Sequence, residues 1–489
     1  MKIRVIGGGL AGPEAALTAA RLGCQVELYE MRRVVDGKPV LTPAHRTTDF
    51  GELVCSNSLK SESEWTAPWL LKQEMRRLGS ALLKIADETA VPAGHALAVD
   101  RVEFSRRISE AIAAEPGIRV IREEVTSLNP GGDGAKCTIV ATGPLTSDAL
   151  SNDIERLTGS GHLAFYDSIS PIVDAETIDL NRVYFAARWD KGTADYINCP
   201  MSREEYDRFY EALLTAEAAE AKEWEKLDYF EGCLPIEVLA RRGRDTLRFG
   251  PMKPVGLRDP RTGRNAWAVV QLRKENVRAS SYNLVGFQNH LKRGEQARVL
   301  RLIPGLENAR FLRYGQIHRN TYICAPALLD ETLRLKIAPE GRIENSPGQA
   351  QRGPGNTPEN TVCAPEGRSK PLENTLLFAG QISGVEGYTE SIATGMLAGI
   401  YAASLARSEE PDPVPRATAL GSLVHYITHA DTKDFQPANI TFDLLEPLDE
   451  ETRRRIRDKK ERHQIQCERA LEALDTWMAN RNQPVTPGD

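Results

Sequence analysis

The sequence lacks paired cysteines, long apolar runs and a net positive charge, and each absence excludes a class of protein. Its eight cysteines are scattered and form no C-x-x-C pair, which argues against a disulfide framework, a zinc site and a dithiol redox motif. No uncharged apolar run is long enough to span a membrane, and residue 2 already begins an apolar strand pattern, so we expect neither an anchor nor a signal peptide. The net charge of −6 over 489 residues gives no global signal for nucleic acid. We expect a cytoplasmic protein of two or three domain equivalents.

The first thirty residues carry a dinucleotide-binding pattern. An apolar strand pattern at 2–6 runs into Gly7-Gly8-Gly9-Leu10-Ala11-Gly12, which has G-x-G-x-x-G spacing, and an Ala/Leu-rich helix pattern follows at 13–22. A second strand pattern at 25–29 ends at Glu30, about where an acid reaches a ribose hydroxyl. The glycines permit a tight turn and a close approach to a pyrophosphate, which the helix N-terminus stabilises. This order of elements predicts a bound dinucleotide.

A second glycine-rich turn lies near the other end of the chain. A strand pattern at 375–378 ends in Ala379-Gly380-Gln381, and a Gly-punctuated loop at 382–388 leads into a small-residue helix pattern from 389 to about 405. Backbone in such a turn can approach a flat ring, and the helix N-terminus can stabilise negative charge on a reduced flavin. Together with the N-terminal motif this favours FAD. A weaker signal is the Ala-Thr-Gly143 turn that follows a strand pattern at 138–140.

The fold class that these patterns predict is α/β, with a Rossmann-like FAD-binding domain of the two-dinucleotide-fold type interrupted by an inserted α+β substrate domain. We expect the FAD-binding domain at 1–168 and 319–448, the inserted domain at 169–318, and a C-terminal helix and tail at 449–489. Within these ranges we expect helices at 202–226 and 449–477, a hairpin or loop at 131–134, and a mobile surface loop at 338–373, which is rich in Pro, Gly and Asn.

Two cysteines are candidates for chemistry. Cys55 lies among hydroxyl and amide groups, and Cys233 lies in a turn bracketed by glycine and proline. Nearby cations would raise the thiolate fraction of either side chain. We interpret five of the other cysteines as buried, inert thiols: Cys24, Cys137, Cys199, Cys324 and Cys467.

A basic segment and a histidine pair are further candidates for binding. Residues 241–264 carry eight positive and two negative charges and could engage phosphates, with a solvated loop as the alternative. His425 and His429, at i and i+4, show no acidic partner or third ligand in the sequence. We therefore predict packing histidines and no metal site.

The chain closely resembles the folate- and FAD-dependent tRNA uracil-5-methyltransferases (TrmFO), which are relatives of the GidA-type tRNA-modifying flavoproteins. The resemblance covers most of residues 1–450 and is carried by the stretches at 6–15, 53–59, 167–173, 230–235, 248–255 and 378–388. The stretch at 338–373 is longer than we expect in the family, and the tail beyond about 450 is extended.

The resemblance implies a reaction. NADH or NADPH would reduce FAD, and the reduced flavin would pass the methylene of 5,10-methylenetetrahydrofolate to C5 of a uridine in the tRNA T-loop, leaving 5-methyluridine. Cys233 would add to C6 of the uracil as nucleophile and Cys55 would remove the C5 proton, although the two roles can be exchanged.

The resemblance and the motifs together imply two sets of binding residues. The expected cofactor-binding residues are Gly7, Gly8, Gly9, Leu10, Ala11, Gly12, Glu30, Asn57, Gly143, Gly380, Gln381, Glu386, Gly387 and Tyr388. Tyr388 is a candidate for stacking on folate or flavin. The expected tRNA-binding residues are Arg241, Arg242, Arg244, Arg248 and Lys253.

Two alternatives stay open at this point. A GidA-like wobble-uridine modifier would also use FAD and folate, but it needs a GTPase partner and a much longer C-terminal helical region. A non-catalytic, FAD-containing tRNA-binding protein would keep its function with serine at both Cys55 and Cys233. The methyltransferase interpretation needs no obligate protein partner.

Overall fold

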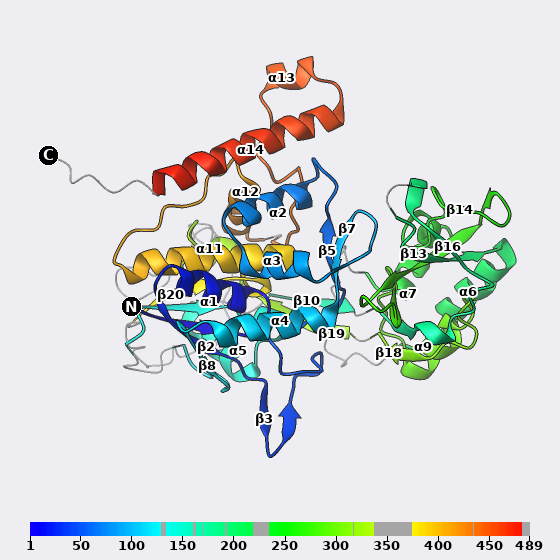
Figure 1. Ribbon diagram of the computed structural model, residues 1–489, viewed down its shortest axis with the longest axis horizontal. Coiled ribbons are helices and arrows are strands. Elements are labelled where there is room, and N and C mark those ends of the chain that lie inside the picture. Colours follow the sequence, from blue (N-terminus) through cyan, green and yellow to red (C-terminus); the bar gives the residue numbers. More distant parts are fainter. Residues whose placement is uncertain are drawn as a thin grey trace, which may run out of the picture.

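The structure is a computed structural model and describes residues 1–128, 134–159, 163–168, 170–190, 193–218, 234–315, 317–336, 374–433 and 435–481. At 163–168 and 317–320 only the backbone is described. These residues form two packed bodies side by side, a larger one built from both ends of the chain and a smaller one built from its middle (Figure 1). Most of the hairpin expected at 131–134, the loop expected at 338–373 and Cys233 lie outside the described residues.

A five-stranded parallel sheet forms the centre of the larger body, in the order β20–β9–β1–β2–β8. Its strands are β1 (Lys2–Ile6), β2 (Gln25–Tyr29), β8 (Ile118–Ile121), β9 (Cys137–Val140) and β20 (Thr375–Phe378). Val140 lies beside both Ile6 and Phe378, so the carboxyl ends of β1, β9 and β20 meet at one edge. Segments far apart in the sequence therefore share one sheet, which confirms the α/β prediction.

Two helices with small residues at their contact cover this sheet. Helix α1 (Ala11–Arg21) follows β1, and α11 (Tyr388–Ala406) follows β20 (Figure 1). A methyl group on Gly395 would run into the backbone of Ala11, and one on Gly399 would run into the backbone of Ala15. The glycines of α11 therefore let the two helix backbones approach closely.

The rest of the larger body surrounds this unit. Its other helices are α2 (Ala67–Arg77), α3 (Ala81–Glu88), α4 (Arg101–Ala114), α5 (Asp148–Thr158), α10 (Ala325–Leu328), α12 (Ala419–His429), α13 (Glu450–Arg455) and α14 (Lys459–Arg481). Short antiparallel strands form two further pieces, the hairpin β3 (Arg33–Val35) with β4 (Lys38–Val40), and the ladder β5 (Ser58–Ser61), β7 (Ala96–Val99) and β6 (Ala90–Val91). In the part of the chain that the structure describes, no helix combines the length and apolarity needed to cross a membrane.

The smaller body is built on a six-stranded antiparallel sheet in the order β12–β13–β16–β17–β11–β18. Its strands are β11 (Ile172–Asp174), β12 (Tyr184–Ala186), β13 (Tyr196–Met201), β16 (Ala268–Lys274), β17 (Ser281–Leu284) and β18 (Phe311–Arg313). Helices α6 (Arg203–Thr215), α7 (Ile236–Arg241), α8 (Thr246–Phe249) and α9 (Arg293–Leu300) and the hairpin β14 (Arg258–Asp259) with β15 (Arg264–Asn265) complete it.

The antiparallel pair β10 (Leu163–Ser168) and β19 (Ile317–Tyr322) carries the chain between the two bodies. The domain boundaries expected at 168–169 and 318–319 fall on this pair, and as exact positions they stay predictions.

Two expected helices differ from those in the structure. The helix expected at 202–226 ends at Thr215, because the next residues turn away so that Glu217 accepts a backbone hydrogen bond from Lys292 at 2.9 Å. The helix expected at 449–477 is broken into α13 and α14, with Ile456 extended and buried between them. Asp458 then accepts the Lys460 N–H at 2.9 Å, so a new helix begins here and α13 does not continue.

Glu74 holds two helices of the larger body together and makes its stability depend on pH. From α2, its fully buried carboxyl accepts the Ala419 and Leu420 N–H groups at 2.7 and 2.9 Å, at the start of α12. Burial raises the pKa of Glu74 from 4.5 to about 8, against the lowering effect of those hydrogen bonds. A raised folded-state pKa stabilises the fold below the unfolded pKa, and this stabilisation is lost as the pH rises from about 4.5 to about 8.

We expect Glu74→Gln to reduce this pH dependence. The wild-type melting temperature should fall more between pH 5.5 and pH 8.5 than that of the variant, because glutamine does not titrate and still offers an acceptor to α12. Differential scanning calorimetry at both pH values measures the difference. Equal falls in the two proteins would contradict the assignment.

Candidate active site

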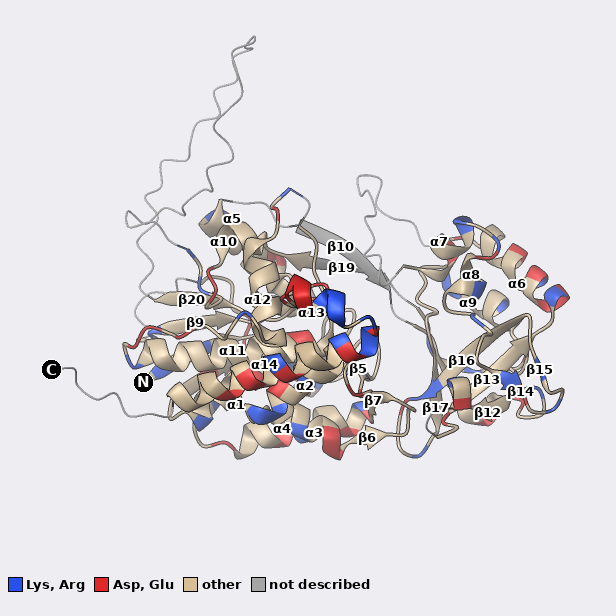
Figure 2. Ribbon diagram, turned by 90° about the horizontal axis from the view of Figure 1, so that it is seen from above, with Lys and Arg blue, Asp and Glu red and all other residues tan. Residues whose placement is uncertain are grey.

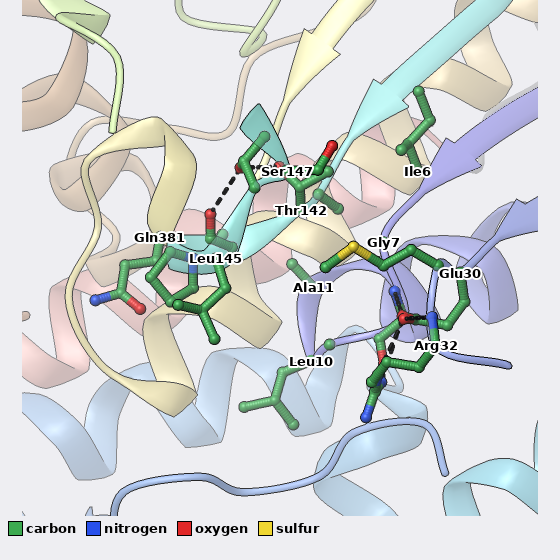
Figure 3. Close-up of a pocket in the computed structure, with 18 of the residues that line it drawn as sticks. Ile6, Gly7, Leu10, Ala11, Glu30, Arg32, Thr142, Leu145, Ser147 and Gln381 are labelled. Atoms are coloured by element: carbon green, nitrogen blue, oxygen red, sulfur yellow. Dashed lines mark hydrogen bonds and ion pairs between the residues drawn. The ribbon is translucent and has the colours of Figure 1, made fainter. Parts of the chain in front are cut away.

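A cavity opens where the carboxyl ends of β1, β9 and β20 meet. It encloses about 990 Å³ of space between atoms, part of it open to solvent. Its walls come from the turn after β1, the end of β2 and the turns after β9 and β20 (Figure 3). The start of α11 and loop residues around His45, Glu52 and Glu123 complete the lining. The carboxyl edge of a parallel sheet is where ligands bind in folds of this kind.

The glycines of the first turn have different roles. A methyl group on Gly7 or on Gly12 would collide with backbone, that of Ala141 for Gly7 and that of Gly7 for Gly12, so both positions need glycine for packing. Gly9 has no atom within 4 Å of the place where its Cβ would lie, and it lines the cavity at the start of α1. A pyrophosphate fits this open position next to a helix N-terminus.

Glu30 is held as an ionised acceptor beside this turn. It accepts the Gly8 N–H at 2.6 Å and the Arg32 Nε–H at 2.9 Å, and both charged side chains are buried (Figure 3). Burial alone raises the pKa of Glu30, but Arg32 and the backbone N–H of Gly8 outweigh it, so this pKa lies below its ordinary value. A carboxylate at the cavity wall can accept a hydrogen bond from a ribose hydroxyl of a bound dinucleotide. Arg32 was not among the expected residues, although its place two residues after Glu30 was a usable signal.

The cavity brings together most of the residues that the sequence predicted for the cofactor. Those that line it are Gly7, Gly8, Gly9, Leu10, Ala11, Glu30, Gly143, Gly380, Gln381 and Tyr388. Gly12, Asn57, Glu386 and Gly387 do not line it. Glu386 accepts a hydrogen bond from Gln381 at 2.7 Å. The fully buried Asn57 donates to the carbonyl oxygens of Val99 and Lys274, each at 2.9 Å, so its side chain connects the two bodies.

Cys55 lies on a loop that is fixed to the cavity wall by Tyr388. The Tyr388 hydroxyl accepts the backbone N–H groups of Cys55 and Ser56, at 2.8 and 3.2 Å, while the residue itself lines the cavity. Burial raises the pKa of Tyr388. Cys55 is partly exposed. Cys24, Cys137, Cys199 and Cys467 are buried, and burial raises the pKa of each, as suits inert thiols.

Three arginines surround the Cys55 loop: Arg101 is partly buried, and the buried Arg273 and Arg313 come from the smaller body. Arg273, on β16, donates to Ser56 at 2.7 Å and to Asn57 at 3.0 Å. Arg101 donates to the carbonyl of Leu53 at 2.6 Å and is paired with Glu275. Burial lowers the pKa of Arg313 to about 10, and repulsion from Arg101 and Arg46 adds to this shift.

Arg101 and Arg313 both lie close enough to interact electrostatically with Cys55 and Tyr388. Cations near a thiol favour its ionised form. These arginines therefore give Cys55 an electropositive environment.

The expected tRNA-binding residues lie on the smaller body, but they are not equivalent. Arg244 forms an ion pair with Asp207, and Arg248 forms one with Asp245 at 2.6 Å while lying over the Trp267 ring. Arg241, Arg242 and Lys253 are exposed. Figure 2 shows further Lys and Arg residues around β14 and β15. The position of Cys233 itself lies outside the described residues, just before α7.

His425 and His429 have an acidic neighbour that the sequence did not reveal. Their rings stack with centroids 4.3 Å apart, and Glu331 lies 3.6 Å from Nε2 of His429. The expectation of no acidic partner was therefore wrong. Glu331 and His429 are exposed, and exposed acidic groups are common without an ion, so the absence of a metal stays a prediction.

A nucleotide cavity made at one sheet edge from both ends of the chain is the arrangement of the Rossmann-like, FAD-binding flavoproteins. The chain is similar in fold to two crystal forms of Aquifex aeolicus GidA, with TM-scores of 0.65 and 0.63 at 18% identity. The matches cover 98% and 97% of this chain and 73% and 76% of those chains. A family model described as glucose inhibited division protein A matches residues 2–340 and 352–410.

Proteins of similar sequence show to which branch of this family the chain belongs. The chain is 63% identical to a methylenetetrahydrofolate–tRNA-(uracil-5-)-methyltransferase TrmFO of Koribacter versatilis, covering 98% of each chain. It is 58% identical to the TrmFO of Solibacter usitatus, covering 97% of this chain and 98% of that one. The chain belongs to the GidA family of flavoproteins and, within it, to the TrmFO proteins.

Proposed function

We propose that this protein is a methylenetetrahydrofolate- and FAD-dependent tRNA (uracil-5-)-methyltransferase that forms 5-methyluridine in the T-loop. The observation that carries the proposal is the position of Cys55. The backbone of Cys55 is hydrogen-bonded to Tyr388 in the wall of a dinucleotide cavity, its thiol is partly exposed, and arginines from both bodies lie near it. A thiol beside a flavin site suits a reaction in which a thiolate activates a pyrimidine for one-carbon transfer.

The cavity residues would hold FAD. Gly9 and the start of α1 would receive its pyrophosphate, the Glu30 carboxylate its ribose, and the turns at Gly143 and Gly380 its flat ring. Bound FAD supplies the electrons and the one-carbon chemistry that turn a folate methylene into a methyl group. The sequence has one Gly-rich strand–helix motif, so NADH or NADPH would reach this cavity without a nucleotide-binding fold of its own.

The two cysteines would act on the uracil ring. C5 of uracil is a poor nucleophile until a thiolate adds to C6, and the C5 proton then has to leave before the thiol is released. Arg101 and Arg313 lie close enough to Cys55 to interact with a negative charge there. Cys233 and Cys55 would share the roles of nucleophile and base. Exposed Arg241, Arg242 and Lys253 would contact tRNA phosphates.

Nucleoside mass spectrometry tests the proposal. Purified protein is incubated with T-loop-unmodified tRNA, FAD, NADH and methylenetetrahydrofolate, and parallel reactions omit the folate or replace it with S-adenosylmethionine. We expect 5-methyluridine in the folate reaction alone. A protein that carries flavin and yields no product, or yields it from S-adenosylmethionine, would overturn the proposal.

Tyr388→Phe is expected to slow methylation about tenfold at unchanged flavin content. The variant keeps the ring at the cavity wall and removes the hydroxyl that accepts the Cys55 and Ser56 N–H groups. Loss of these hydrogen bonds should remove about 1–2 kcal/mol of the free energy that holds the loop in place. Single-turnover methylation at saturating tRNA measures the effect. Tyr426→Phe is the matched control, because the Tyr426 hydroxyl donates to the Gln436 carbonyl and does not hold the Cys55 loop. A wild-type rate in Tyr388→Phe would show that the hydroxyl does not position Cys55.

A further inference from the structure

Two large apolar side chains on the smaller body, Trp189 and Phe249, are exposed although they are aromatic. Trp189 is 59% exposed and Phe249 is 79% exposed. Trp189 has a φ of 63° and its neighbour Asp190 has a φ of 52°, a left-handed conformation that non-glycine residues adopt rarely. A strained turn that presents an indole to solvent points to a function for that side chain.

Backbone contacts make the turn and the segment that follows α8 into one surface. The Trp189 N–H donates to the carbonyl of Gly256 at 2.7 Å, and Arg188 donates to the carbonyl of Lys253 at 3.1 Å. The Lys253 N–H in turn donates to the carbonyl of Gly250, the residue after Phe249, at 3.2 Å. Trp189 and Phe249 therefore both border the segment 250–256, which carries Lys253.

The charges around these aromatic side chains favour an anionic partner. Lys253, Arg258 and Arg264 are exposed, and among the described residues none of the three forms an ion pair. Among the described residues around this surface, Asp259 is paired with Arg261 and Asp245 with Arg248, and Asp190 adds an exposed carboxylate at the turn. Aromatic faces interleaved with cations are the pattern that proteins use to hold unpaired nucleotides.

A line of polar side chains leads from this surface to Cys55. Arg188 also donates to Gln271 of β16 at 2.9 Å. Gln271 and Arg273 point to the same face of β16, about 7 Å apart along the strand. Arg273 then holds Ser56 and Asn57, next to Cys55. A tRNA loop whose target base lies at Cys55 could thus extend along this line to the aromatic surface.

We propose that Trp189 and Phe249 form a stacking site for an unpaired base of the tRNA loop that carries the target uridine, with Lys253 taking a backbone phosphate. The proposal rests on the proposed function, because it takes tRNA as the substrate. It adds a binding site for a second nucleobase, which would position the loop so that the target base reaches Cys55.

The test measures binding of unmodified T-arm hairpin RNA to the full-length flavin-loaded protein at one fixed salt concentration. Trp189→Ala is expected to weaken binding about tenfold, as for loss of one stacked base. Trp189→Phe should restore most of the affinity, whereas Trp189→Leu should not. Leu180→Ala, which also removes a side chain that is 59% exposed, is the matched control and should bind like the wild type. NADH oxidation without RNA should be equal in all of these variants.

Hairpins in which one loop base at a time is removed identify the stacked base. One abasic hairpin should bind the wild type about tenfold more weakly than the intact hairpin and should bind Trp189→Ala with no additional loss. Affinity of Trp189→Ala equal to that of Leu180→Ala, or equal affinities of Trp189→Leu and Trp189→Phe, would overturn the stacking site. Failure of the wild type to form 5-methyluridine is a separate result, because it bears on the proposed function and not on hairpin binding.

Discussion

Cys55→Ala is expected to lower 5-methyluridine formation by a factor of about 10² to 10⁴, the range for loss of a positioned proton-transfer group. The thiol is held beside the cavity by the Tyr388 hydroxyl and lies among Arg101, Arg273 and Arg313. Its removal leaves the cavity walls unchanged, so flavin content and NADH oxidation should stay at wild-type levels. Single-turnover nucleoside mass spectrometry, with visible absorbance for bound flavin, measures both quantities.

Cys324→Ala is the matched control for this prediction. Cys324 is also partly exposed, but its thiol has a pKa raised by burial and lies near the Thr432 carbonyl, away from the cavity lining. Its variant should methylate normally. Wild-type activity in Cys55→Ala, or an equal loss in Cys324→Ala, would contradict the assignment of Cys55.

The division of roles between the two cysteines can be tested with T-arm RNA that carries 5-fluorouridine at the target position. Fluorine at C5 cannot leave as a proton does, so the covalent adduct with the attacking thiolate accumulates. An adduct that survives denaturation in Cys55→Ala but not in Cys233→Ala would make Cys233 the nucleophile. The reverse pattern would exchange the two roles.

Gly9→Asp is expected to remove the flavin. The Cβ of residue 9 would enter open space, so the substitution does not strain the turn, and its carboxylate would project into the cavity at the start of α1. There it would occupy the pyrophosphate position and repel the phosphates at the helix N-terminus. Bound flavin per chain should fall at least about tenfold, since two like charges at contact distance cost more than about 1.4 kcal/mol.

Gly294→Asp is the matched control for Gly9→Asp. Gly294 lies in the first turn of α9 and also has open space around its Cβ, but it is in the smaller body. This variant should keep its flavin and its melting temperature. Gly9→Asp with full flavin content would show that the pyrophosphate does not lie at this turn, and unfolding of Gly9→Asp by circular dichroism would show that the turn cannot accept a side chain.

The sequence pointed to most of the residues that line the cavity because its signals are local. The spacing of Gly7, Gly9 and Gly12, the strand patterns around them and the turn at Gly380 are each contained in a few consecutive residues. Glu30 was predicted for the same reason. The structure adds that Gly9 is the open position and that Gly7 and Gly12 are required by packing.

The surroundings of Cys55 were not predictable in this way. Arg273 and Arg313 approach the loop from β16 and β18, more than two hundred residues away along the chain, and nothing in their own segments marks them. The basic segment shows the same limit. A count of charges treats Arg244, Arg248 and Lys253 alike, whereas ion pairs with Asp207 and Asp245 engage the first two.

The contact between Arg273 and the Cys55 loop restricts how these proteins can be recombined. The smaller body is an insertion, which suggests that a relative's version could be exchanged for it at β10 and β19. Even if such a chimera folds and binds flavin, the loop that carries Cys55 is held at Ser56 and Asn57 by hydrogen bonds with β16 of the insertion. A transplanted insertion without arginine at that position would leave the thiol misplaced, so the exchangeable unit is the insertion together with residues 53–58.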